Sequence, residues 1–127
     1  MQTHPATLKH GVSFPIGNEI DITSRAMKAL SHPVRLQIVK HLAQGELSVT
    51  ELIDRIPTHS QSSISQHLAS LFKNGIVSSR RQGTLHFYQI NDWRTCVLVR
   101  MIVETFCPAS AEQASDHNPT TEALSAA

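Results

Sequence analysis

Hydrogen-bonding side chains recur at helical spacing in residues 60–77, SQSSISQHLASLFKNGIV. At about 100° per residue, Ile64, Leu68 and Leu71 share one face of the expected helix. The opposite face carries Ser62, Gln66, Ala69 and Lys73 at helical spacing, while Ser65 flanks this face and Gln61 lies in the first turn. Such side chains reach base edges and phosphates in a major groove, and the N–H groups of a helix's first turn suit a phosphate. The pattern predicts a helix that binds DNA through its polar face.

A basic hairpin follows this helix in residues 76–90, IVSSRRQGTLHFYQI. The apolar pattern changes there to that of two short strands, and Gly83 supplies the turn between them. Four residues would lie where such a hairpin meets the flanking backbone or minor groove of DNA: Arg80, Arg81, Thr84 and His86. A polar helix face or a basic hairpin alone is typical of a solvated surface, whereas both in this order, after a short helix and a tight connection, indicate a winged helix-turn-helix.

The other elements support this fold. Helices are expected over residues 19–30, 33–43, 48–56, 60–74 and 92–107. Ser31 is the expected N-cap of the second helix, with Pro33 in its first turn. Ser48 and Glu51 have the spacing of a capping box at the start of the third. The predicted fold is mainly α with a β-hairpin wing, in the order α-α-α-α-β-β-α.

Length and composition indicate one domain with two tails. The chain has 127 residues, of which 40% are hydrophobic, enough for a core. We expect a flexible N-terminal arm over residues 1–18, a DNA-binding and dimerisation domain over 19–107, and a disordered tail over 108–127. With neither a signal-peptide pattern nor an apolar run of about 18 residues, we expect a cytoplasmic protein that does not enter a membrane. The net charge of +1 does not by itself indicate a nucleic-acid partner.

The segments ALSHPVRLQIVKHLAQGELSVTELI and SQSSISQHLASLFKNGIVSSRRQGTLHFYQI closely resemble the ArsR/SmtB family of winged-helix repressors. The resemblance runs from about Ala26 to Ile90. It rests on the AL-x-HP-x-R start of the second helix, the S-x-HL core of the fourth and the arginine-rich wing that ends in Tyr88. It implies a homodimeric repressor that binds a palindromic operator in double-stranded DNA until an inducer releases it. It also implies that the fourth helix contacts bases through Gln61, Ser62, Ser65 and Gln66, while the wing contacts the backbone.

The last helix gives a local argument for the dimer. WRTCVLVRMIVETFC, residues 93–107, is apolar nearly all round, and such a helix must be buried. A domain of this size has little core to cover it, so we expect a homodimer through the first and last helices. The alternative is a fully buried core helix in a monomer.

The family's metal sites do not carry over. Ser48 and Thr50 stand where some members have cysteines, and hydroxyl groups are poor ligands for soft metals. At the last helix Asp92 matches one ligand of a family zinc site, but Arg94 does not match the next, and an arginine opposes a cation. The eight histidines are scattered over the chain without a short i, i+4 pair, so we expect them to be unconnected. We predict no metal and no cofactor.

Cys96 and Cys107 leave three hypotheses open. They stand eleven residues apart, about 16 Å along one helix, so they cannot form a disulfide within it. They would be ordinary residues of an apolar helix, thiols that sense oxidants or persulfides, or thiolate ligands of a metal or metalloid. The ending ETFC resembles a family branch that senses through two cysteines, but Lys40 stands where that branch has the second one.

Two other functional classes compete with a DNA-binding regulator. An enzyme is not expected, because the sequence has no glycine-rich phosphate loop, nucleophile elbow or metal-hydrolase motif. A winged helix that binds only proteins would have a more apolar or acidic outer face on its fourth helix. Here that face is polar, ends in Lys73 and is followed by Arg80 and Arg81.

Overall fold

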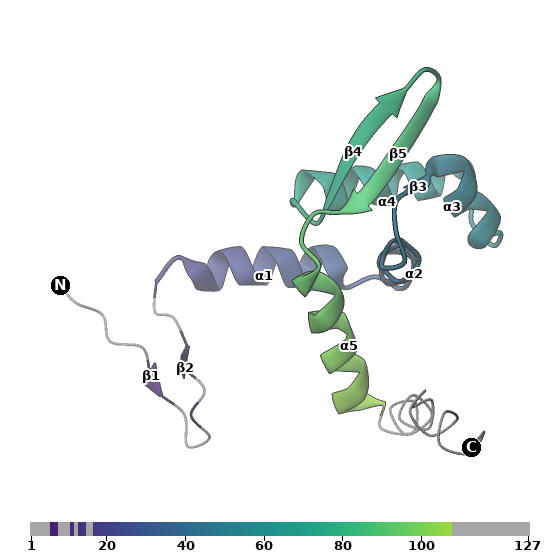
Figure 1. Cartoon of the computed structure of the whole chain (residues 1–127). Helices are drawn as coiled ribbons and strands as arrows, with labels where there is room; N and C mark the ends of the chain where they lie inside the picture. The colour runs from purple at the N-terminus through teal and green to yellow at the C-terminus, as the bar shows by residue number, and fades with distance from the viewer. Residues whose placement is uncertain (1–5, 8–10, 12, 15–16, 108–127) are drawn as a thin grey trace, which may run out of the picture. The chain divides into compact units, whose positions relative to one another are not determined.

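The computed structural model describes residues 6–7, 11, 13–14 and 17–107 (Figure 1). The chain forms two compact units, one of residues 1–92 and one of residues 93–127. The part of the chain that the structure describes has no helix that is both long and apolar enough to cross a membrane.

The first unit contains the predicted helix-turn-helix and wing. Its helices and strands are β1 (Ala6–Thr7), β2 (Ser13–Phe14), α1 (Glu19–Leu30), α2 (Pro33–Leu42), β3 (Leu47–Ser48), α3 (Val49–Arg55), α4 (Gln61–Lys73), β4 (Val77–Gln82) and β5 (Leu85–Ile90). The bounds of α1 match the prediction, and α2 and α4 are one residue shorter at one or both ends. The helix-turn-helix consists of α3 and α4, with residues 56–60 between them.

The N-cap of α2 is His32, and the prediction of Ser31 was wrong. The backbone of His32 is extended, and its Nδ1 accepts a hydrogen bond from the N–H of Val34 at 3.2 Å. Ser31 instead closes the last turn of α1, where its N–H donates to the carbonyl of Lys28 at 3.2 Å. Because only these two residues separate the helices, the first must end α1 and the second must begin α2.

Ser48 both ends a strand and begins a helix. Its hydroxyl accepts from the N–H of Glu51 at 3.1 Å while the Glu51 carboxylate reaches back to Ser48, which confirms the predicted capping box. Together with Leu47 it also forms β3, which pairs with β5 through Leu47↔Tyr88 and Ser48↔Phe87. The sequence did not reveal β3, because two residues are too few to show an alternating pattern.

The three-stranded antiparallel sheet has the order β3-β5-β4. The hairpin β4–β5 keeps one register from Val77↔Ile90 to Gln82↔Leu85, with Gly83 and Thr84 in the turn. Gly83 has a φ of +62°, a value that a two-residue hairpin turn requires at its first position and that glycine adopts without strain. The predicted hairpin is therefore confirmed, and Figure 1 shows it as a long projection next to α4.

The core of this unit is built around α4, which packs on α2, α3 and β4. Its most deeply buried large side chains are Ile38, Val39, Leu52, Ile64, Leu68 and Leu71. Three of them, at positions 64, 68 and 71, are the predicted inward stripe of α4. The same periodicity therefore places the opposite face of α4 outside.

Part of the predicted N-terminal arm is a small hairpin. Strands β1 and β2 pair antiparallel through Ala6↔Phe14 and Thr7↔Ser13. The flexibility of the arm stays a prediction. The predicted disordered tail, residues 108–127, lies outside the described residues.

The described part of the second unit is one helix, α5 (Arg94–Phe106). It is shorter than the predicted 92–107, because its N-cap is Trp93 and its C-cap is Cys107. None of its residues is buried within the single chain. Large apolar side chains are instead exposed, among them Trp93 at 72%, Met101 at 60% and Phe106 at 78%.

Candidate nucleic-acid interface

The outer face of α4 is exposed and mostly polar, with Phe72, 54% exposed, at its edge. All five residues predicted there to touch DNA are exposed: Gln61, Ser62, Ser65, Gln66 and Lys73. Ala69, in the middle of the face, is exposed as well, so no bulky side chain blocks a close approach. Ile64, Leu68 and Leu71 on the opposite face are completely buried. The predicted division of the helix into a packed and a free face is therefore confirmed.

The first turn of α4 is arranged to receive a negative charge. The hydroxyl of Ser60 caps the helix by accepting from the N–H of Ser63 at 3.2 Å. The first turn contains no acidic residue. The N–H groups at a helix's start have no partner within the helix, and the helix dipole adds partial positive charge there. A DNA phosphate would satisfy both.

The two arginines of the wing lie on opposite faces of the hairpin. Arg81 is exposed and stands across from His86, whereas Arg80 stands across from Phe87. Thr84 is exposed in the turn at the hairpin's tip. Since neighbouring residues of a strand point to opposite faces, the two arginines cannot meet DNA in the same way.

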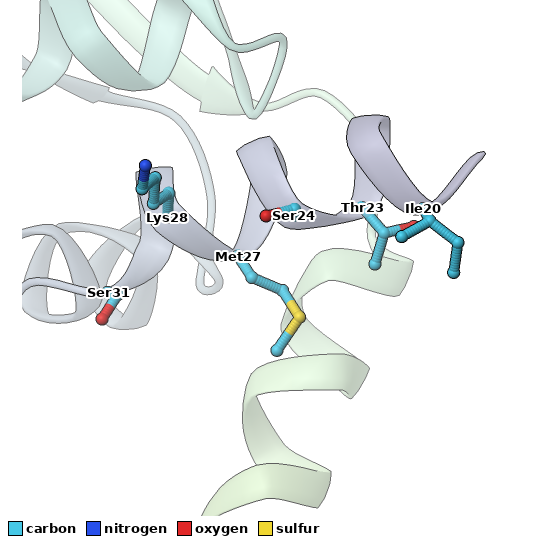
Figure 2. Close-up of a pocket in the computed structure, with 6 residues that line it drawn as sticks. All are labelled: Ile20, Thr23, Ser24, Met27, Lys28 and Ser31. Carbon is cyan, nitrogen blue, oxygen red and sulfur yellow. The ribbon is translucent and has the colours of Figure 1, made fainter. Parts of the chain in front are cut away.

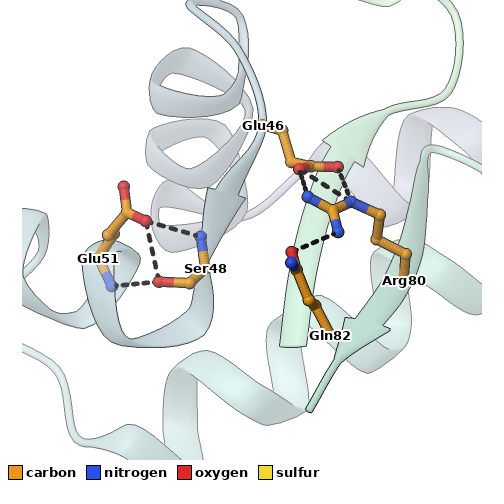
Figure 3. Close-up of polar contacts among 5 residues, drawn as sticks. All are labelled: Glu46, Ser48, Glu51, Arg80 and Gln82. Carbon is orange, nitrogen blue, oxygen red and sulfur yellow. Dashed lines mark hydrogen bonds and ion pairs between the residues drawn. The ribbon is translucent and has the colours of Figure 1, made fainter. Parts of the chain in front are cut away.

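Arg80 is held by a residue that the sequence did not reveal. Its Nε lies 3.0 and 2.9 Å from the two carboxylate oxygens of Glu46, and its Nη2 lies 2.6 Å from one of them. Its Nη1 donates to Gln82 at 3.1 Å (Figure 3). The hydrogen bonds from Arg80 hold the pKa of Glu46 below its usual value. The carboxylate of Glu46 is therefore ionised at neutral pH, so both side chains of the ion pair are charged.

His32, the N-cap of α2, and His67 in α4 are far apart in the sequence but lie in contact, so the expectation of unconnected histidines was wrong. The ring centroids of His32 and His67 lie 4.3 Å apart. Arg35 donates from Nε to Nδ1 of His67 at 3.2 Å and from Nη1 to the carbonyl of Ala29 at 3.1 Å. Burial lowers the pKa of His67, and the nearby His32, Arg35 and His59 lower it further. Arg35 of α2 thus links α1 to His67 of α4, which is neutral at neutral pH.

The remaining candidate sites involve metals and thiols. Among the described residues, no group of three or more histidine, cysteine or acidic side chains could hold a metal ion. Both cysteines are free thiols. Cys96 is half-buried in α5, and Cys107 is exposed at its end.

The sequence and the fold match known proteins. A profile of bacterial regulatory proteins of the arsR family matches residues 32–79. The "Biofilm growth-associated repressor" of Xylella fastidiosa (strain Temecula1) is 35% identical over 101 residues, which cover 80% of this chain and 88% of that protein. This chain belongs to the arsR family. It is a DNA-binding transcriptional regulator and not an enzyme, as the sequence predicted.

Other arsR-type regulators have similar chains and similar folds. The "Transcriptional activator HlyU" of Vibrio cholerae is 36% identical over 84 residues, 66% of this chain and 77% of HlyU. A solved structure of HlyU from Vibrio cholerae matches with a TM-score of 0.65 at 32% identity, covering 72% of this chain and 99% of that one. A homodimeric winged helix-turn-helix domain, Mb0332 from Mycobacterium bovis, matches with a TM-score of 0.62 at 27% identity, covering 83% and 94%. These likenesses confirm the predicted winged helix-turn-helix.

Proposed function

We propose that this regulator binds a specific operator by placing α4 in the major groove of double-stranded DNA and its wing on the flanking backbone. The observation that carries the proposal is the outer face of α4, which is exposed and polar while its inner face is completely buried. The polar side chains of this face offer hydrogen bonds to bases, and Phe72, which is 54% exposed, lies at its edge next to Ser65.

Each part of this surface has a proposed role. Gln61, Ser62, Ser65 and Gln66 contact base edges, and Lys73 contacts a phosphate. In the wing, Arg81 contacts the backbone, with Thr84 and His86 beside it. Arg80 was predicted to do the same, but its bonds to Glu46 favour Arg81 as the main phosphate contact.

We propose that the regulator acts as a homodimer on a palindromic operator. Both α1 and α5 expose apolar side chains, and Figure 2 shows Ile20, Thr23 and Met27 along one face of α1. A hollow of about 480 Å³ follows this face. A partner subunit would cover such surfaces, and a two-fold axis would place two α4 helices about 34 Å apart, one turn of DNA. The homodimeric state of Mb0332 supports this proposal.

Repression is the proposed outcome of binding, as the name of the Xylella relative suggests. Since such a regulator meets its operator on the chromosome, the proposed location is the cytoplasm. Release would follow from a small inducer or from modification of a thiol, and exposure makes Cys107 the more reactive candidate. We expect mass spectrometry after polysulfide or oxidant treatment to find modified Cys107 together with weaker DNA binding, which the Cys107→Ser variant should not show. Unmodified thiols with unchanged affinity would exclude thiol sensing.

Binding to the protein's own upstream region tests the main proposal. A gel shift in moderate salt should show a complex with this fragment that a scrambled duplex of equal length does not displace. Arg81→Gln should weaken binding to both duplexes and reduce the slope of log K against log salt by about one, because one phosphate contact is lost. If wild-type protein binds neither duplex, a winged helix that binds only proteins is the better description.

A further inference from the structure

One ion pair ties together all three strands of the sheet that carries the wing. Glu46 directly precedes β3, Phe87 lies in the central strand β5, and Arg80 lies in β4. The guanidinium carbon of Arg80 lies 4.4 Å from the centroid of the Phe87 ring, while its nitrogens bond Glu46 and Gln82. Figure 3 shows the carboxylate of Glu46 facing the edge of the guanidinium. The side chain is therefore held at its edge and on one face.

This arrangement leaves the two wing arginines in different states. The Nε and Nη2 groups of Arg80 are engaged by one carboxylate, in the paired geometry in which arginine also binds a phosphate. A phosphate and Glu46 would thus compete for the same donors. Arg81, on the other face of β4, is exposed beside His86. Free guanidinium groups bind the phosphate backbone of any sequence, so a second free arginine would raise affinity without discrimination.

We propose that Glu46 is a specificity-determining residue and Arg80 a positioning residue: their ion pair orients the wing and keeps Arg80 from binding phosphates on non-operator DNA. This inference rests on the proposed DNA binding. Arg80 acts on DNA through the hairpin that it braces, so its charge adds nothing to the salt dependence of binding. The mutation Glu46→Gln would release the cation next to the duplex.

Salt titrations of four proteins test this inference: wild type, Glu46→Gln, Arg80→Gln and the double variant. Affinities are measured for the protein's upstream fragment and for a scrambled duplex of equal length, over a range of salt concentrations. Glu46→Gln should steepen the slope of log K against log salt by about one and bind the scrambled duplex more tightly, which lowers the specificity ratio. Arg80→Gln should keep the wild-type slope.

The double variant separates the released arginine from the simple loss of a negative charge. If Glu46 acts through Arg80, the double variant has the slope of Arg80→Gln, and the steepening disappears. A slope for Glu46→Gln equal to that of wild type would overturn the inference. So would a reduction of the slope in Arg80→Gln as large as the reduction in Arg81→Gln. If wild type binds neither duplex, the proposed function fails as well. If wild type binds its operator and only these slopes disagree, the inference alone fails.

Discussion

Truncating Gln66 and Leu68 to alanine should separate DNA binding from folding, although the two residues lie only two positions apart on α4. Leu68 is completely buried, and removing a buried leucine side chain costs about 2–5 kcal/mol of stability. Because a small domain is stable by only about 5–15 kcal/mol, Leu68→Ala removes a large share. At about 4–8 °C per kcal/mol, its melting temperature should fall by at least about 8 °C.

Gln66 faces solvent, so its truncation should leave stability within about 0.5 kcal/mol of wild type. A bidentate contact with a base contributes about 1–3 kcal/mol of discrimination. At about 1.4 kcal/mol per factor of ten, Gln66→Ala should weaken operator binding about 5- to 140-fold. Binding to a scrambled duplex should change little.

Thermal unfolding followed by circular dichroism measures the first effect, and fluorescence anisotropy at one fixed salt concentration measures the second. All proteins are compared at equal concentration, because association between subunits would make melting depend on it. The reasoning about base contact is refuted if Gln66→Ala binds operator and scrambled duplexes as wild type does. The reasoning about packing is refuted if Leu68→Ala melts at the same temperature as wild type.

Three further predictions concern the supports of this surface. Ser60→Ala should cost about 1 kcal/mol of stability through loss of the N-cap of α4, and it should weaken operator binding by loosening the first turn. The control Ser60→Thr should retain most of the stability and most of the operator affinity. Equal melting of Ser60→Ala and wild type would argue against the cap. The lowered pKa of His67 means that the unfolded chain takes up a proton first as the pH falls. The stability that the neutral His67 contributes is therefore complete above about pH 6.5, the pKa of an unfolded histidine, and is lost as the pH falls through the lowered pKa of the folded state. Melting curves at pH 7.5 and 5.5 should differ less for His67→Gln than for wild type. Gly83→Ala should destabilise the hairpin by about 1 kcal/mol through the positive φ alone, because an added Cβ would meet no atom within 4 Å. Its DNA affinity should fall while the salt slope stays unchanged. Unaltered melting would show that the turn tolerates alanine.

Local features of the sequence predicted most of the fold and the candidate face of α4. A repeat of 3.6 residues assigned Ile64, Leu68 and Leu71 to the core, and it thereby assigned Gln66 to the surface. The capping box of Ser48 and Glu51 and the turn at Gly83 each depend on residues within a few positions of one another. Their geometry is set by the chain near them, so the sequence alone was enough.

Only the tertiary structure decided which polar side chains meet across the fold. Glu46 and Arg80 are 34 residues apart, and His67 joins Arg35 from a position 32 residues away. No spacing rule reaches that far, because these contacts exist only after α4 and the sheet have packed. The sequence therefore determined which surface could contact DNA, while packing decided that Arg80 is bound to a carboxylate and that His67 is linked to Arg35.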